Sequence, residues 1–102
     1  MSPRRYNPNS KWNDPAELKC LYVFKVLHEE GFPRGKQLKM CIELSEETGL
    51  SAGNLSAKVG NFKSVAGINN PSNASENTKS IFIEYGNLTS KELEKIIGKY
   101  VL

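Results

Sequence analysis

A chain of 102 residues with 38% hydrophobic content is the size of one small domain that buries most of its apolar surface on folding. The net charge of +3 is modest, and the basic excess lies in residues 1–39, which hold eight Lys/Arg against four Asp/Glu. No apolar run is long enough for a membrane-spanning helix or a signal peptide. We therefore expect a soluble, cytoplasmic protein without a membrane partner.

The first twelve residues, MSPRRYNPNSKW, contain three basic side chains and no acidic one. Arg4, Arg5 and Lys11 predict a flexible basic arm over residues 1–12, followed by one domain over residues 13–102. In some DNA-binding modules such an arm follows the phosphate backbone or enters the minor groove. A solvated tail that only aids solubility is the alternative interpretation.

The sequence NDPAE predicts the start of a first helix over residues 15–30. Asp14 is expected to cap it, Pro15 suits the first helical position, and Glu17 stands three residues after the cap. Apolar residues occupy a broad sector of this segment, which predicts a central helix with neighbours on several sides. Gly31 is expected to end the helix, because glycine tolerates the positive φ angle of a helix terminus.

A second helix is predicted over residues 36–48, ended by Gly49, and a third over residues 52–63, capped by Ser51. Two helices around a tight glycine turn are typical of a helix-turn-helix unit. The second helix is expected to turn one face inward, formed by Leu38, Cys41, Ile42 and Ser45. The inward residues of the third recur at spacings of four and three and are Leu55, Val59 and Phe62.

Residues 64–76 contain glycine, proline, three asparagines and three serines, and are expected to form a loop. A fourth helix is predicted over residues 76–85, stopped by Gly86. A fifth begins at a capping box of Thr89 and Glu92 and runs to about residue 99. The fold class is therefore predicted to be all-α, a single domain of about five helices containing a helix-turn-helix-like unit.

The residue types needed for catalysis or metal binding are sparse. His28 is the one histidine in the sequence, and it lies beside glutamates at the polar end of the first helix. Cys20 and Cys41 lie in apolar helical patterns without a CxxC pair, which favours buried thiols over zinc ligands or a disulfide. The sequence predicts no catalytic residue, no metal and no cofactor, and hence a protein that is not an enzyme.

The outer face of the third helix is the strongest candidate for a binding surface. With its apolar side buried, the opposite side carries Asn54, Ala57, Lys58 and Asn61 and no carboxylate. Asparagine can pair with adenine, and lysine can reach guanine or phosphate, so this face suits a major groove of DNA. Contact with a protein and a bland solvated surface are the alternatives.

A set of residues, within a likeness that covers roughly Trp12 to Ile97, matches a known pattern. Its members are Trp12, Leu44, Ser45, Thr48, Gly49, Ser51, Gly53, Lys58, Asn61, Phe62, Gly67, Asn73, Ser75, Phe82, Glu84 and Tyr85. In order and spacing they resemble the small helical module at the N-terminus of certain bacterial proteins that also carry an HNH nuclease domain. That module is generally presumed to bind DNA, so the resemblance implies this role for the region of the third helix, without catalysis. The family usually has a basic residue after the turn glycine, where this chain has Leu50.

The sequence thus predicts a non-enzymatic protein that binds double-stranded DNA, as a regulator or targeting subunit in a restriction or phage-defence setting. The residues expected to contact DNA are Arg4, Arg5, Lys11, Ser51, Asn54, Lys58, Asn61 and Lys63. The alternative function is an adaptor or inhibitor that binds a protein, for example a mobile-element decoy that acts on a host defence nuclease. Capture of a small ligand by the loop 67–77 is a third hypothesis.

Overall fold

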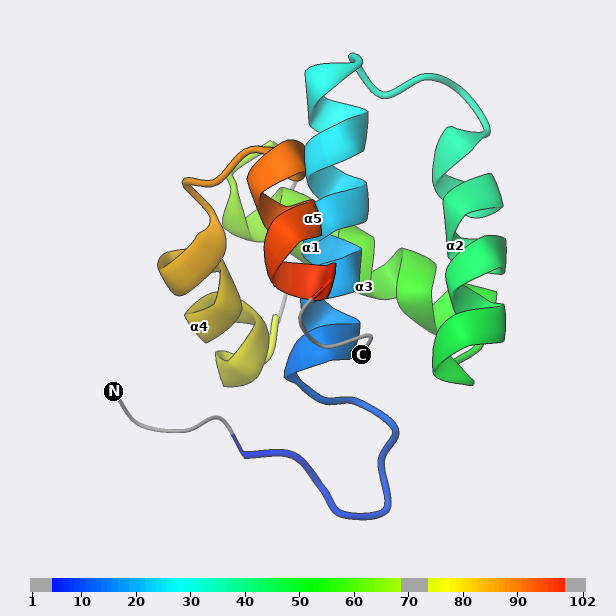
Figure 1. The fold of residues 1–102 in the computed structure, drawn as a ribbon, viewed down its shortest axis with the longest axis vertical. Helices are drawn as coiled ribbons and strands as arrows, with labels where there is room; N and C mark the ends of the chain where they lie inside the picture. Colours follow the sequence, from blue (N-terminus) through cyan, green and yellow to red (C-terminus); the bar gives the residue numbers. More distant parts are fainter. Residues whose placement is uncertain (1–4, 69–73, 99–102) are drawn as a thin grey trace.

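The computed structural model describes residues 5–68 and 74–98, and within these ranges it contains five α-helices and no strand. The helices are α1 (Asp14–Glu29), α2 (Lys36–Thr48), α3 (Ala52–Val65), α4 (Glu76–Tyr85) and α5 (Ser90–Gly98), as Figure 1 shows. The predicted all-α class is confirmed. The bounds of α2 and α4 are those predicted, and α3 extends to Val65 rather than to residue 63.

Side-chain caps fix the starts of α1, α3, α4 and α5, whereas α2 begins without a side-chain cap. The Ser51 hydroxyl accepts a hydrogen bond from the Asn54 N–H at 3.1 Å, which confirms the predicted cap of α3. At α1 the predicted cap at Asp14 is wrong. The Asn13 side chain accepts from the Ala16 N–H at 2.9 Å, and Asp14 is the first residue of the helix. Asparagine and aspartate cap equally well, so the extended backbone at Asn13 decides between them.

The predicted capping box at the start of α5 is confirmed. The Thr89 N–H donates to the Glu92 carboxylate at 2.9 Å, and the Glu92 N–H donates to the Thr89 hydroxyl at 3.2 Å. A residue of α1 also reaches this helix start. The Glu29 carboxylate accepts from the Ser90 N–H at 3.0 Å and from the Ser90 hydroxyl at 2.7 Å. These two hydrogen bonds lower the pKa of Glu29 below its usual value.

The helix α1 is the centre of the fold, as its broad apolar sector predicts. The other four helices all pack against it, and in Figure 1 α5 lies in front of it while α3 crosses behind. Its buried apolar residues are Ala16, Leu18, Cys20, Leu21, Val23, Phe24 and Leu27. A helix that is apolar on several sides must be covered on several sides, which explains the arrangement.

The remaining core comes from one face of each surrounding helix. Leu55, Val59 and Phe62 of α3 are fully buried, as predicted. Ile81 of α4 and Leu93 of α5 are also fully buried. These side chains close the space around α1 and hold α3 in a fixed position.

The helix α2 packs through a different face from the predicted one. Cys41 is buried as expected, but Leu38 and Ile42 are 56% and 50% exposed. The side that is buried or half-buried runs through Gln37, Cys41, Leu44 and Thr48. Gln37 explains the rotation, because its side-chain amide donates to the Ser56 hydroxyl of α3 at 2.8 Å and to the Ser56 carbonyl at 3.2 Å.

Candidate nucleic-acid interface

The connection between α2 and α3 is a turn of three residues, Gly49 to Ser51. Gly49 has a φ angle of 77°, in the left-handed region that glycine adopts without strain. Leu50 is 7% exposed and packs into the core, so an apolar residue at this position has a structural role. With Leu50 turned inward, the chain presents the beginning of α3 at the surface.

The first two turns of α3 form an exposed surface, which we call the α3 start: Ser51, Gly53, Asn54 and Ala57. No residue of α3 is acidic. The Lys11 ammonium lies beside this surface, where it donates to the Gly49 carbonyl at 3.2 Å. Asn61, one turn beyond Ala57, is half-buried.

Lys58, predicted to lie free on the same face, is instead part of the interior. Its side chain is 13% exposed, and its ammonium lies 3.2 Å from the Glu17 carboxylate. The ammonium also donates to the Thr78 hydroxyl at 2.9 Å and lies 4.5 Å from the centre of the Trp12 ring. The ammonium is held by a carboxylate, a hydroxyl and an aromatic ring, so the predicted exposure of Lys58 is wrong.

Lys63, the other lysine among the predicted contacts on α3, also has partners within the protein. Its ammonium donates to the Gln37 side-chain oxygen at 2.9 Å and lies 4.8 Å from the centre of the Phe32 ring. Gln37 in turn donates to Ser56, so these residues tie the middle and end of α3 to the start of α2. Lys63 therefore stabilises the position of α3 in this structure.

Glu17 is the centre of a buried polar cluster that sequence reasoning missed. Its side chain is 1% exposed, and one oxygen accepts from the Thr78 hydroxyl at 2.7 Å. The other oxygen lies 2.8 Å from the Tyr6 hydroxyl, whose single hydrogen is shared with the Asp14 carboxylate at 2.9 Å. The Thr78 hydroxyl has one hydrogen, which goes to Glu17, so at 3.0 Å Thr78 accepts the hydrogen of Ser75. Each buried side-chain nitrogen and oxygen in the described part of the chain has a partner. The cluster joins α1, α3 and α4 to the segment before α1.

That segment, residues 5–12, lies against the helices, and we call it the N-terminal strap. Besides Tyr6 and Lys11, it is held by Asn77, whose side-chain amide donates to the Arg5 carbonyl. Trp12 packs partly buried against the core. The contacts of the strap were not predicted from the sequence, and its flexibility remains a prediction. Arg4 lies outside the described residues.

Tyr6 makes the attachment of the strap sensitive to alkaline pH. Burial, followed by the neighbouring carboxylate of Glu17, raises the pKa of Tyr6 above its usual value. A raised pKa in the folded state means that the neutral phenol stabilises the fold. This contribution is complete below the unfolded pKa of about 10 and is lost as the pH rises beyond it.

We expect the stability difference between the parent and Tyr6→Phe to shrink above about pH 10. The parent loses the contribution of its neutral phenol there, whereas phenylalanine does not ionise. Urea unfolding at a series of pH values from about 8 to 11 measures both proteins. A difference that stays constant across this range would show that the Tyr6 hydroxyl does not couple to folding.

The described residues contain no group of three or more His, Cys, Asp or Glu side chains that could hold a metal ion. The His28 ring stacks on Phe24 with a centroid separation of 5.6 Å. Cys20 and Cys41 are free and buried, as predicted, and burial raises the pKa of both thiols. In the described part of the chain, no helix is long and apolar enough to cross a membrane.

Comparison with known proteins gives no family model, no curated protein and no solved structure that matches this chain. Of the predicted contact residues that the structure describes, Arg5, Lys11, Ser51 and Asn54 are exposed, Asn61 is half-buried, and Lys58 and Lys63 are engaged within the protein.

Proposed function

We propose that the protein binds double-stranded DNA through the α3 start, with the N-terminal strap contacting the phosphate backbone. The observation that carries this proposal is the exposed surface of Ser51, Gly53, Asn54 and Ala57, which carries no carboxylate and lies beside the Lys11 ammonium. The short turn between α2 and α3 and the resemblance to the presumed DNA-binding module support the same choice.

The chemistry of this surface suits a duplex. The N-terminus of a helix carries a partial positive charge, and its first N–H groups point outward, which favours phosphate. Gly53 and Ala57 are small enough to let a backbone or groove wall come close. Asn54 is exposed, and its amide can pair with an adenine edge. Lys11 and Arg5 are exposed and supply cations for phosphates.

The proposed contact set is smaller than the sequence predicts. Lys58 and Lys63 are left out because their ammonium groups already bind Glu17 and Gln37. Both residues act indirectly, since they hold α3 against α1, α2 and α4. A change at either residue would alter the position of the reading helix as well as any direct contact.

Asn54→Ala is expected to weaken binding to a preferred duplex by about 5- to 150-fold, the loss of one paired base contact. Lys11→Ala should weaken binding to all sequences and reduce the salt slope by about 0.9, because one phosphate contact is lost. A duplex selected from a random library, titrated by fluorescence anisotropy at several salt concentrations, measures both effects. Thermal stability should change by less than about 0.5 kcal/mol, because both side chains are exposed.

Lys91→Ala is the matched control, because Lys91 is exposed on α5 and its loss removes the same charge. We expect it to reduce affinity much less than Lys11→Ala. Equal effects of the two lysine substitutions would show that Lys11 affects DNA binding only through the net charge of the protein and not through its own phosphate contact. If no duplex is retained from the library at low salt, or if Asn54→Ala binds as the parent does, the α3 start is not a DNA reader.

A further inference from the structure

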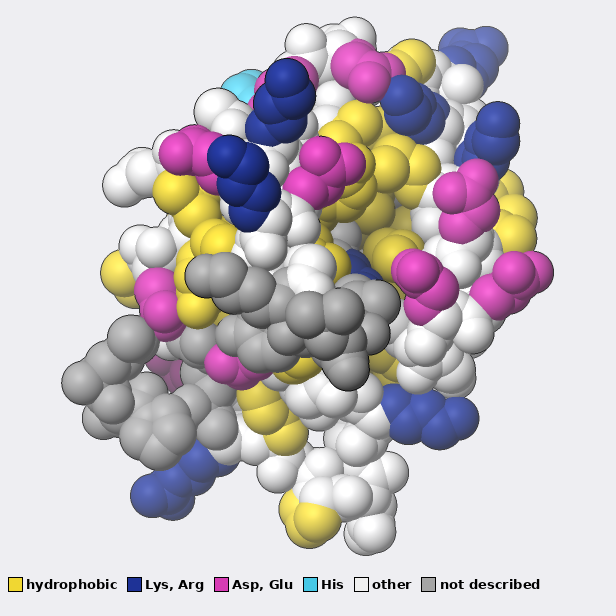
Figure 2. Space-filling view, in the orientation of Figure 1, with side chains coloured by type: hydrophobic (Ala, Val, Ile, Leu, Met, Phe, Trp, Pro, Cys, Tyr) yellow, Lys and Arg dark blue, Asp and Glu magenta, His cyan; other side chains and the backbone are white. Residues whose placement is uncertain are grey.

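The helices α2 and α5 stand apart over α1 and leave an apolar hollow between them. Figure 2 shows hydrophobic side chains at its floor and acidic side chains around it. Two adjoining depressions of about 400 and 380 Å³ make up the hollow, and both are lined by Tyr22, Leu44 and Glu47. We call this feature the α2–α5 groove.

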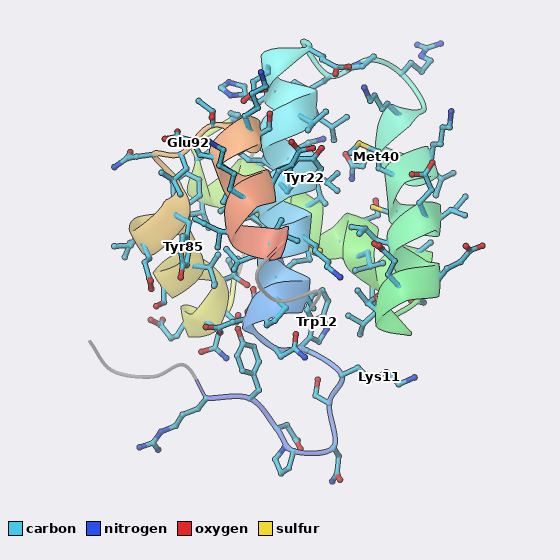
Figure 3. All side chains as sticks on the ribbon, in the orientation of Figure 1. Lys11, Trp12, Tyr22, Met40, Tyr85 and Glu92 are labelled. Atoms are coloured by element: carbon cyan, nitrogen blue, oxygen red, sulfur yellow. The ribbon has the colours of Figure 1, made fainter. Side chains whose placement is uncertain are left out.

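The walls of the groove come from three helices. Tyr22 and Val23 of α1 and Met40 and Leu44 of α2 line one half, and Ile97 of α5 lines the other. Tyr22 and Met40 are labelled in Figure 3, on the two sides of the gap. The Tyr22 hydroxyl donates to the Glu94 carboxylate at 3.0 Å, which joins the floor to the α5 wall.

The rim is strongly acidic. Glu43, Glu46, Glu47 and Glu94 border the groove, and Lys19 is the basic residue among its lining. Lys39 lies one turn before Glu43 on α2 and lines the adjoining depression with Met40 and Glu43. Glu43, Glu46 and Glu47 are exposed, and none of them forms an ion pair with another described residue. Glu43 and Glu47 are one turn apart on α2, an arrangement of like charges that destabilises a helix slightly. The positive charges of a cationic occupant would be attracted to both carboxylates and would offset their mutual repulsion.

We propose that the α2–α5 groove binds a basic amphipathic helix of a partner protein, with an apolar stripe on the floor and Lys or Arg beside the glutamates. Apolar side chains seated between two helices over a third, with charges at the rim, are the elements of helix-in-groove recognition. The described residues have no strand edge that an extended segment could pair with, so a helix satisfies its own backbone best. The carboxylates repel phosphate, which separates this surface from the proposed DNA contact.

The test uses two designed peptides of about 16 residues that share one stripe of leucines at helical spacing. One carries lysines on its remaining positions, and the other carries glutamates. We expect saturable binding of the lysine peptide and none of the glutamate peptide by fluorescence anisotropy. Amide shifts on addition of the lysine peptide should concentrate at Tyr22, Met40, Leu44 and Ile97.

Glu47→Lys is the test variant, because Glu47 borders both depressions. It should weaken the lysine peptide about tenfold at low ionic strength and less at high salt. Glu76→Lys is the control, because Glu76 is exposed on α4, outside the groove, and the same charge is reversed. It should change the affinity little.

Three results would each overturn the proposal. One is the absence of saturable binding, or equal binding of the glutamate peptide. Another is a set of amide shifts centred on the exposed pair Leu38 and Ile42 or on the α3 start. The third is a concentration-dependent dimer of the protein alone that Glu47→Lys dissociates, because this would assign the groove to a second copy of the chain.

Discussion

Replacing Lys58 with methionine should lower the free energy of unfolding by about 3 kcal/mol. Removal of one partner of a buried ion pair leaves the other charge without compensation, and the Glu17 side chain is 1% exposed. The loss is placed at the lower end of the usual range because Thr78 and Tyr6 still donate to Glu17. Urea unfolding at neutral pH measures the effect.

The double variant Glu17→Met/Lys58→Met is the control for this result. Replacing a whole buried ion pair with apolar residues of similar size is often neutral, so the double variant should be more stable than Lys58→Met alone. A single variant within about 0.5 kcal/mol of the parent would contradict a structural role for Lys58 and return its ammonium to the list of possible DNA contacts.

Phe62→Ala should destabilise the fold by about 3 to 5 kcal/mol, the largest effect that we expect from an apolar substitution. The Phe62 side chain is fully buried, and it packs in the core that α3 shares with α1. Truncation removes its buried surface and leaves a cavity that the neighbouring helices fill only in part. Chemical denaturation gives the free energy of unfolding.

Leu38→Ala is the control for Phe62→Ala, because it truncates a large apolar side chain that is exposed rather than buried. Leu38 is 56% exposed on α2, so its truncation should cost less than about 1 kcal/mol. The contrast also tests the observed rotation of α2, because the sequence pattern places Leu38 in the core. A loss at Leu38 as large as that at Phe62 would favour the predicted face of α2 over the observed one.

The helix positions were predictable because the signals that set them are local. Ser51 caps α3 and the Thr89 and Glu92 pair caps α5 through contacts no more than three residues along the chain. Gly49 ends α2 through its own backbone angle. The broad apolar sector of α1 likewise gave its central position, because a sector of that width cannot stay exposed.

The face of α2 was not predictable from hydrophobic spacing. Its half-buried side includes Gln37, which donates to Ser56 of α3, and Thr48, which donates to the Leu44 carbonyl of its own helix. The large apolar residues Leu38 and Ile42 face solvent. A prediction that counts only apolar residues therefore turns the wrong face of such a helix toward the core. For α2 the predicted face is rotated about the helix axis by roughly the angle between two neighbouring residues.

The candidate site was predicted in part. Asn54 and Ser51 are exposed at the start of α3, as expected, but Lys58 is occupied by Glu17 and Thr78, which lie 41 and 20 residues away in the sequence. Pairing over such distances depends on how the helices pack. One signal was present: Glu17 stands among the apolar residues of α1, and a carboxylate in a buried sector requires a cation or several hydrogen-bond donors.

The contact between α1 and α5 has a consequence for how the protein is made. Glu29 accepts hydrogen bonds from Ser90, 61 residues further along the chain. At usual translation rates of about 5 to 20 residues per second, roughly 3 to 12 seconds separate the synthesis of these two residues. During this interval the helix at the centre of the core exists without the helix that covers one of its sides. The nascent chain therefore exposes the apolar surface of α1 that α5 covers until α5 has been made, and a chaperone can bind it in this interval.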